Sequence, residues 1–181
     1  MRLTAQHWKH YAKLVLRPFL RGWPDEGRKI VQGPPLRRLL QYIMSPRSVL
    51  NAGAGEGLFS ALLLKKPGVL RLVELDYSYG SHPRSAVDGR QRMVGASLTA
   101  IPAPSGTFDL VLCTEVLEHI ADDATALDEL RRVLSPGGWL LITVPTLPAV
   151  YDPNHVHEGY TTKDLAEMLE ARGLEIVKTT F

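Results

Sequence analysis

The chain has 181 residues, of which 45% are hydrophobic and 22% are charged, a composition typical of one soluble domain large enough to build a three-layer core. No uncharged apolar run approaches the ~18 residues that a membrane-spanning helix needs. The single Cys113 excludes an intramolecular disulfide, and no apolar segment followed by a cleavage site opens the chain. We therefore expect one domain over residues 1–181, located in the cytoplasm.

The charge is unevenly distributed. Residues 1–47 carry a net charge of +8, whereas residues 48–181 carry −6. Such asymmetry indicates either an anionic partner, such as nucleic acid or a membrane surface, or a basic segment that docks on its own acidic body. We favour docking, and nucleic acid stays open as a partner.

Two helices are predicted within residues 1–47. Thr4 can cap the first helix, whose apolar side includes Trp8 and Tyr11. A loop over 22–33 follows, and Pro34 with the next proline opens the second helix.

The segment SVLNAGAGEGLFS, residues 48–60, predicts a strand, a tight turn and the start of a helix. Gly53, Gly55 and Gly57 stand at alternate positions, where the missing Cβ atoms let backbone N–H groups face a small polar or anionic ligand group. A dinucleotide fingerprint needs a further glycine where this chain has Leu58. The turn therefore disfavours a pyrophosphate and, with it, an NAD-dependent oxidoreductase.

An acidic residue follows the second predicted strand. The run from Val69 to Leu75 closes on Asp76, about 20 residues after the glycine turn, where a carboxylate can accept hydrogen bonds from ribose hydroxyls. Glu74 is the alternative, because it points to the same side of the strand.

The remaining chain alternates strands and helices, as in an α/β fold. Thr107–Thr114 is apolar enough for a central strand covered on both faces. Asp122 or Asp123, and then Thr161 or Thr162, cap the two helices of this half. The other predicted strands are Gln91–Gly95, Trp139–Val144 and Leu174–Phe181. A long polar loop over Pro145–Gly159 contains His155 and His157, and lies at the carboxyl edge of the sheet, where ligands bind in open α/β sheets.

Three segments together, SVLNAGAGEGLFS, FDLVLCTEVLEHI and LSPGGWLLITVP, resemble the class I S-adenosylmethionine-dependent methyltransferases, and the resemblance covers most of residues 48–181. It implies an α/β fold with a doubly wound, mostly parallel sheet of order 3-2-1-4-5-6, in which the seventh strand is missing. The two leading helices would form an N-terminal helical cap over the substrate pocket, residues 1–47. The implied cofactor is S-adenosyl-L-methionine.

The resemblance also implies the cofactor contacts. These are Asn51, Ala52, Gly53, Gly55, Gly57, Asp76, Ser97, Leu98, Thr114 and Glu115. Asn51 and Ala96 depart from the family, which usually has acidic residues at these positions.

The implied activity is methyl transfer to a small-molecule acceptor that the sequence does not identify, with a hydroxyl favoured over nitrogen or carbon. A hydroxyl needs a group that removes its proton, and the predicted catalytic residues are His119 and His155, with His157 as a further candidate.

If a helical turn begins at Glu115, this residue shares a face with Glu118 and His119. Such a set could hold a divalent cation and is similar to the E-x-x-E-H pattern of metal-assisted O-methyltransferases, including RNA 2′-O-methyltransferases. The same pattern occurs in similar enzymes without metal, so a metal ion is not among our predicted components. The alternatives are therefore a metal-assisted RNA 2′-O-methyltransferase or a protein that binds the cofactor without catalysis.

The predicted sixth strand, Leu174–Phe181, has no following strand to pair with. An open apolar edge can pair with a second chain, and we therefore expect either a homodimer formed through this edge or a chain cut short of its natural terminus.

Overall fold

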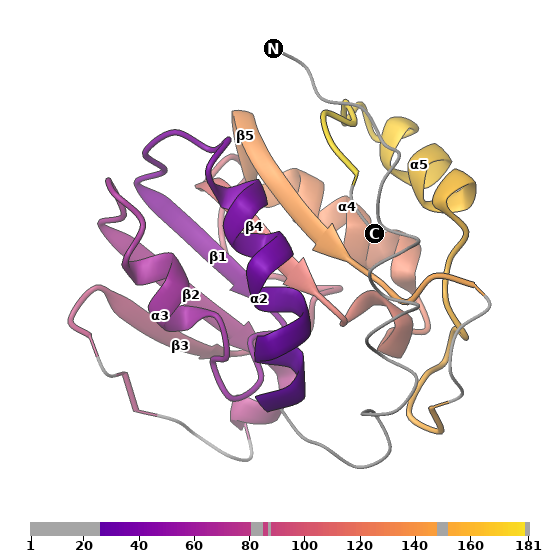
Figure 1. Cartoon of the computed structure of the whole chain (residues 1–181), viewed down its shortest axis with the longest axis horizontal. Coiled ribbons are helices and arrows are strands. Elements are labelled where there is room, and N and C mark those ends of the chain that lie inside the picture. Colours follow the sequence, from indigo (N-terminus) through magenta and orange to yellow (C-terminus); the bar gives the residue numbers. More distant parts are fainter. Residues whose placement is uncertain (1–25, 81–84, 87, 148–151, 180–181) are drawn as a thin grey trace.

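The computed structural model describes residues 26–80, 85–86, 88–147 and 152–179. Its centre is a parallel five-stranded sheet of order β3-β2-β1-β4-β5 (Figure 1). The strands are β1 (Ser48–Ala52), β2 (Arg71–Asp76), β3 (Gln91–Gly95), β4 (Phe108–Thr114) and β5 (Leu134–Thr143). The predicted α/β class and the order of the first five strands are thus confirmed.

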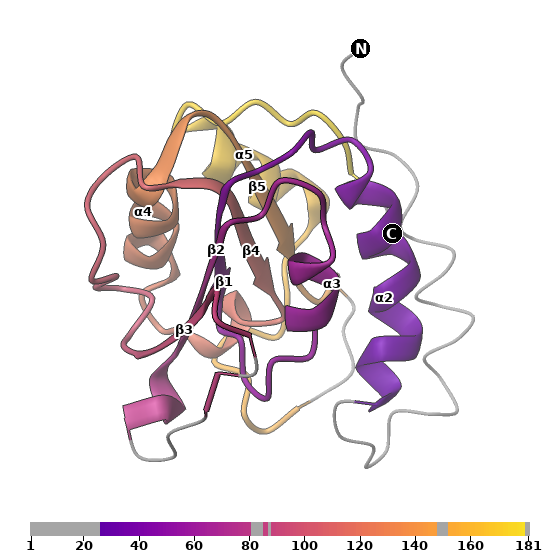
Figure 2. The same cartoon turned by 90° about the vertical axis from the view of Figure 1, so that its left-hand side faces the viewer.

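The helices cover both faces of the sheet. They are α2 (Glu26–Leu40), α3 (Ser60–Leu64), α4 (Asp123–Val133) and α5 (Thr162–Glu170), with two short 3-10 helices, η1 (Tyr77–Gly80) and η2 (Leu117–His119). Figure 2 shows α2 and α3 on one side of the sheet and α4 on the other. Among the described residues, no helix has the length and apolarity that would let it cross a membrane.

Strand β4 alternates its side chains between two apolar cores. Leu110 and Leu112 pack with α2 and α3, whereas Val111 and Cys113 pack with α4, and all four side chains are fully buried. Successive residues of a strand point to opposite faces, so a continuous apolar run suits a strand covered on both sides. The prediction of a central strand here is confirmed.

Two helices are predicted in the N-terminal part of the chain, and the structure tests one of them. The first predicted helix, with Trp8 and Tyr11, lies outside the described residues. The second does not open at Pro34, because α2 already begins at Glu26 and contains both prolines. The prolines remove two N–H donors from the helix, but the turn that follows them buries Leu36 and Leu40 against the sheet, and this packing retains the helix.

The predicted sixth strand is wrong for the described residues, since 174–179 form no strand. A segment that pairs on one side only gains few ladder hydrogen bonds against the cost of ordering it. The dimer predicted through this strand therefore has no strand to form it in the described part of the chain.

Strand β5 also begins earlier than predicted. Leu134 pairs with Phe108, and pairing resumes only at Trp139, opposite Leu110. The residues between them form an irregularity in the ladder that accommodates Gly137, whose φ is +75°. The predicted turn is thus present, but it interrupts the strand instead of preceding it.

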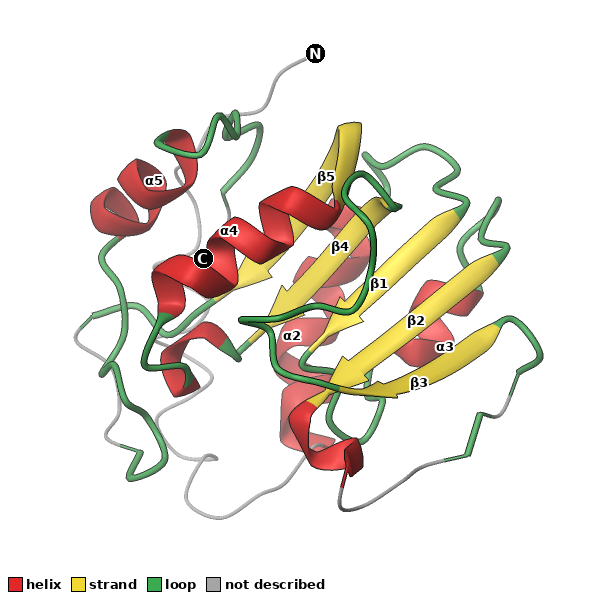
Figure 3. Cartoon of the chain, turned by 180° about the vertical axis from the view of Figure 1, so that it is seen from behind, coloured by secondary structure: helices red, strands yellow, loops and turns green. Residues whose placement is uncertain are grey.

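The order of the strands reverses direction between β1 and β4. The chain runs outward from β1 to β3 and then returns to β4 on the other side of β1. Ligands of open α/β sheets bind at such a switch point, outside the carboxyl ends of the strands. In Figure 3 the arrowheads of all five strands lie at the same end of the sheet, and η1 and η2 follow the carboxyl ends of β2 and β4 in the chain.

A buried acid joins β2 to its neighbours. Glu74 is fully buried and accepts hydrogen bonds from Ser60 at the start of α3 and from Gln91 of β3, the latter at 2.8 Å. This pairing holds Glu74 inside the protein, so it is not the ribose-binding alternative to Asp76 that the sequence left open.

We predict that Gln91→Ala lowers the free energy of unfolding by about 1–3 kcal/mol, because it removes a donor from a buried carboxylate. Urea denaturation measures the loss. The control is Arg92→Ala on the same strand, where the side chain is exposed and the change should stay within about 0.5 kcal/mol. Equal losses in the two variants would show that the Gln91 to Glu74 bond adds nothing to stability.

Candidate cofactor and acceptor site

The glycine turn after β1 is bound to the end of β2. The backbone N–H groups of Gly53 and Ala54 both donate to the carbonyl of Leu75, at 2.8 and 3.0 Å. The N–H of Gly55 donates to Oδ2 of Asp76 at 2.7 Å. The turn and the acid that the sequence singled out are therefore in direct contact.

The first two glycines of the turn have different roles. Both have positive φ, +70° at Gly53 and +48° at Gly55, a conformation that other residues rarely adopt. A Cβ atom on Gly53 would lie 2.2 Å from Cγ2 of Val116, whereas a Cβ atom on Gly55 would meet nothing within 4 Å. Gly53 thus permits packing against the segment after β4, and Gly55 borders open space that a ligand can approach.

Asp76 already accepts three hydrogen bonds within the chain. Besides Gly55, Ser78 donates to Oδ1 through its backbone N–H at 2.9 Å and its hydroxyl at 2.6 Å. A carboxylate offers about four acceptor positions. Two ribose hydroxyls can therefore bind here only if one of these three bonds is exchanged.

Asn51 is a polar residue of β1, and its side chain is buried. Its amide nitrogen Nδ2 has no hydrogen-bond partner among the described residues. A buried donor of this kind calls for an acceptor. Asn51 stands two residues before Gly53, so an acceptor group of a ligand held at the turn is a suitable partner.

The other predicted cofactor residues also stand at the carboxyl edge. Ala52 and Thr114 are the last residues of β1 and β4, and Gly57 closes the turn by donating to the carbonyl of Ala54 at 2.8 Å. Leu98 is buried, and Ser97 contacts the hydroxyl of Thr99 at 2.7 Å.

Glu115 does not join the helical turn that the sequence predicted. It has a φ of +52°, and its backbone N–H and its carboxylate both bind Thr143 of β5, at 3.0 and 2.9 Å. The 3-10 helix η2 begins only at Leu117. The prediction that Glu115 shares a face with Glu118 and His119 is therefore wrong.

Backbone hydrogen bonds attach the polar loop to η2. The N–H groups of Val156 and His157 donate to the carbonyl of Glu118 at 2.9 and 3.0 Å. Nδ1 of His119 bonds to the carbonyl of Asn154 at 2.9 Å. These three bonds connect segments more than thirty residues apart and bring His155 to His119.

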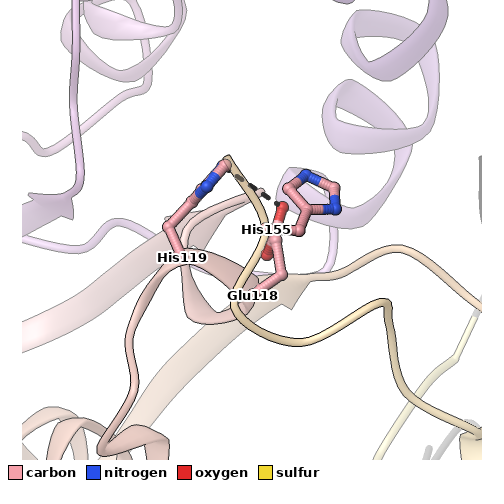
Figure 4. Close-up of side chains that lie close together, drawn as sticks. All are labelled: Glu118, His119 and His155. Carbon is pink, nitrogen blue, oxygen red and sulfur yellow. Dashed lines mark ion pairs between the residues drawn. The ribbon is translucent and has the colours of Figure 1, made fainter. Parts of the chain in front are cut away.

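Glu118, His119 and His155 form one cluster, which we call the Glu-His-His cluster (Figure 4). Their potential ligand atoms lie within 4.8 Å of one another, and the two imidazole rings meet edge to face with centroids 4.8 Å apart. The Glu118 side chain is 1% exposed and the His119 side chain 32%. The two predicted catalytic histidines thus stand together, one of them partly open to solvent.

The contact to Asn154 defines the tautomer of neutral His119. A carbonyl oxygen only accepts hydrogen bonds, so Nδ1 carries the hydrogen and Nε2 holds the lone pair. Nε2 lies 3.9 Å from Oε1 of Glu118. His157 is instead bound to the carbonyl of Ile120 at 3.0 Å and stands outside the cluster.

Two nearby groups are unsuited to proton removal. Burial raises the pKa of the Cys113 thiol, and the carboxylates of Glu118 and Glu115 raise it further. Burial also raises the pKa of Tyr160, together with its hydrogen bond to Asp123. Both groups stay protonated at neutral pH and are therefore not the bases of this edge.

Tyr79 and Asn154 are parts of the site that the sequence did not indicate. Tyr79 is buried and donates its hydroxyl to the carbonyl of Gly55 at 2.5 Å. Tyr79 belongs to η1, and Asn154 contributes its backbone carbonyl to the contact with His119. Neither residue belongs to a motif or a periodic pattern that could have predicted its role.

A glycine turn and an acid at the switch point of a parallel sheet define a site for a cofactor that contains a nucleoside. Residues 50–142 match the family model described as "Methyltransferase domain". The chain therefore belongs to the S-adenosylmethionine-dependent methyltransferases.

Known proteins support this assignment. A Mycolicibacterium smegmatis protein named "Probable S-adenosylmethionine-dependent methyltransferase" is 32% identical over 77% of this chain and 56% of its own length. A ubiquinone biosynthesis O-methyltransferase of Xylella fastidiosa is 32% identical over 69% of this chain and 55% of its own. The chain thus spans about half the length of these relatives. The structure of an Archaeoglobus fulgidus S-adenosylmethionine-dependent methyltransferase shares the fold, with a TM-score of 0.67 at 21% identity over 82% of this chain and 69% of that one.

We predict that Gly53→Ala destabilises the protein by about 1–3 kcal/mol more than Gly55→Ala. Both changes place a side chain at positive φ, but only the first forces it into Val116. Urea unfolding of the two variants gives the difference. Val116→Ala in the Gly53→Ala background should recover part of the loss, and equal destabilisation by the two single changes would contradict the packing role of Gly53.

Proposed function

We propose that this domain binds S-adenosylmethionine at the glycine turn and transfers its methyl group to a hydroxyl of a small-molecule acceptor. The observation that carries the proposal is the contact of Nδ1 of His119 with the Asn154 carbonyl, which leaves the lone pair on Nε2. His119 follows Val116, the residue that packs against Gly53 of the cofactor turn. A base beside a cofactor turn is what an acceptor with a proton to lose requires.

The cofactor half of the site would work through hydrogen bonds and shape. Asp76 would accept the ribose hydroxyls, and the open side of Gly55 would let the cofactor approach the backbone. The buried Asn51 amide would donate to an acceptor group of the cofactor. S-adenosylmethionine is an intrinsically good electrophile, so this half mainly needs to orient it and exclude water.

The acceptor half would supply proton removal. The lone pair on Nε2 of His119 takes the proton of the acceptor hydroxyl while the oxygen attacks the methyl carbon. The bond between carbon and sulfur breaks, and its electron pair returns to sulfur. The products are the methyl ether, S-adenosylhomocysteine and protonated His119, which releases its proton to solvent. His155 would support the imidazole through the edge-to-face contact.

Relatives support a hydroxyl or carboxyl oxygen as the acceptor atom. The Xylella fastidiosa relative and a Halorhodospira halophila malonyl-[acyl-carrier protein] relative are both named O-methyltransferases. The second candidate function is cofactor binding without catalysis. It is favoured by Asn51 and Ala96, which stand where the family usually has acids.

We predict that S-adenosylmethionine and S-adenosylhomocysteine bind in the micromolar range, about 8 kcal/mol, and that Asp76→Ala weakens binding by about 1.5–3 kcal/mol. Isothermal titration calorimetry measures both. Ser78→Ala is the matched control, because it removes a donor that competes with ribose for the same carboxylate and should leave affinity equal or slightly higher. Absence of binding to folded wild-type protein would reject the proposal.

We predict that His119→Ala lowers the rate of O-methylation by about 10²–10⁴-fold while S-adenosylmethionine affinity is retained. Transfer of a labelled methyl group to a panel of phenols and catechols measures the rate. Retained activity in the variant would exclude His119 as the base. Binding of the cofactor by wild-type protein with no transfer to any hydroxyl or amine panel would favour the function without catalysis.

A further inference from the structure

We propose that the amino-terminal edge of the sheet binds the surface of an anionic lipid bilayer. This surface is formed by residues 36–47, which begin in α2, and residues 61–71, which begin in α3, and we call it the basic edge. It lies at the end of the sheet opposite the cofactor turn, because parallel strands all begin at one end and finish at the other (Figure 3). Binding here is therefore independent of the proposed function.

Hydrogen bonds hold the two segments of the basic edge together. The backbone N–H groups of Leu70 and Arg71 both donate to the carbonyl of Arg47, at 2.9 and 3.1 Å. Nζ of Lys66 donates to the carbonyl of Leu40, the last residue of α2, at 2.7 Å. The side chains of the two segments therefore belong to one surface.

The basic edge carries positive charge alone. Neither segment contains an acidic residue, and their cations are Arg37, Arg38, Arg47, Lys65, Lys66 and Arg71. All but Lys66 are exposed, and within the described part of the chain no ion pair joins any of them to an acid. Asp109 borders this edge, but its carboxylate accepts hydrogen bonds from the backbone N–H groups of Arg47 and Ser48, at 2.9 and 3.0 Å. Cations gathered in this way attract an anionic partner.

The basic edge bears on the uneven charge of the sequence. Two explanations were open for the net charge of +8 on residues 1–47, namely an anionic partner or docking on an acidic body. Arg37, Arg38 and Arg47 belong to that part of the chain, and in the structure they share an edge with the cations of residues 61–71. Docking on acidic side chains is therefore not seen for these three arginines, and an anionic partner is the explanation that remains for them.

Exposed apolar side chains stand among these cations. Met44 is 88% exposed, Leu70 58% and Tyr42 50%. At an anionic membrane surface such side chains gain free energy by entering the boundary between headgroups and acyl chains, while nearby Lys and Arg are attracted to the headgroups. Protruding apolar groups within a cationic surface therefore favour a bilayer as the partner.

A nucleic acid is the other anionic partner that the charge would allow. Single strands are bound by stacking their bases on aromatic side chains, and Tyr42 is the one aromatic residue of the two segments. Double strands are bound largely through phosphate contacts, which would leave Met44 and Leu70 exposed to water. The apolar residues of the basic edge therefore suit lipid better than nucleic acid.

The test is co-sedimentation of the full chain with vesicles of phosphatidylcholine, either alone or mixed with an equal amount of phosphatidylglycerol. We expect the mixed vesicles to bind about tenfold more strongly than the neutral ones, and the binding to fall when the salt concentration is raised to about 0.5 M. Arg38→Glu should weaken it about tenfold. The matched control is Lys163→Glu, which makes the same change of charge on α5 at a side chain that is 80% exposed and should leave the binding unchanged.

A second pair of variants tests the apolar contribution. Leu70→Gln should weaken binding to the mixed vesicles about threefold or more, because it removes an apolar group that would enter the bilayer. Val156→Gln is the matched control, since Val156 is also 58% exposed but belongs to the polar loop. This control should bind the mixed vesicles as the wild type does.

Three results would overturn the bilayer assignment. The first is no preference for the mixed vesicles over the neutral ones, and the second is an equal effect of the variant and the control in either pair. The third is binding of a labelled RNA hairpin or DNA duplex without binding of vesicles, which would assign the basic edge to nucleic acid. Circular dichroism checks that each variant is folded.

Titration with S-adenosylmethionine keeps this test separate from that of the proposed function. The cofactor turn lies at the other end of the sheet, so the affinity for S-adenosylmethionine should be the same in the presence and absence of the mixed vesicles. Cofactor binding without vesicle binding would reject the bilayer as partner and leave the proposed function in place. Vesicle binding without cofactor binding would do the reverse.

Discussion

The site depends on the contact between Gly53 and Val116. β1 and β4 are neighbours in the sheet although the chain forms two other strands between them, so the segments that follow them meet at the carboxyl edge. Val116 fills the place that a side chain at position 53 would occupy. Because η2 begins directly after Val116, this contact sets the distance between the cofactor turn and the residues that would face the acceptor.

A second constraint acts through the carbonyl of Glu118. It accepts hydrogen bonds from two successive N–H groups of the polar loop, those of Val156 and His157. Buried backbone groups are costly when they are left without partners, so these bonds hold the loop against η2 whatever side chains it carries. The loop can therefore present different side chains toward the acceptor without losing its position.

The sequence predicts the cofactor half of the site better than the acceptor half. Alternate glycines and an acid at the end of a strand are local patterns, and the structure brings Gly55 and Asp76 into contact. The central position of β4 follows likewise from an unbroken apolar run. Each of these features depends on residue type and spacing alone.

The acceptor half depends on tertiary contacts that no local pattern encodes. The sequence predicts that Glu115 starts a helical turn, but its backbone N–H binds the Thr143 carbonyl at the end of the ladder between β4 and β5. His155 and His157 are two residues apart in a polar loop, and only the loop's bonds to η2 decide which imidazole meets His119. The final segment has strand-forming residues, yet residues 174–179 form no strand, because propensity does not supply a pairing partner.

The orientation of His119 bears on which acceptor atom the domain would methylate. An amine attacks S-adenosylmethionine once it is neutral and needs no base held in a particular direction, whereas a hydroxyl must lose its proton as it attacks or before. Nε2 of His119 has its lone pair directed by a carbonyl on the opposite side of the ring, next to a buried carboxylate and a second imidazole. Such an oriented lone pair contributes little to methylating an amine. It would contribute directly to methylating a hydroxyl by accepting the proton, and this is the reason why we propose oxygen as the acceptor atom.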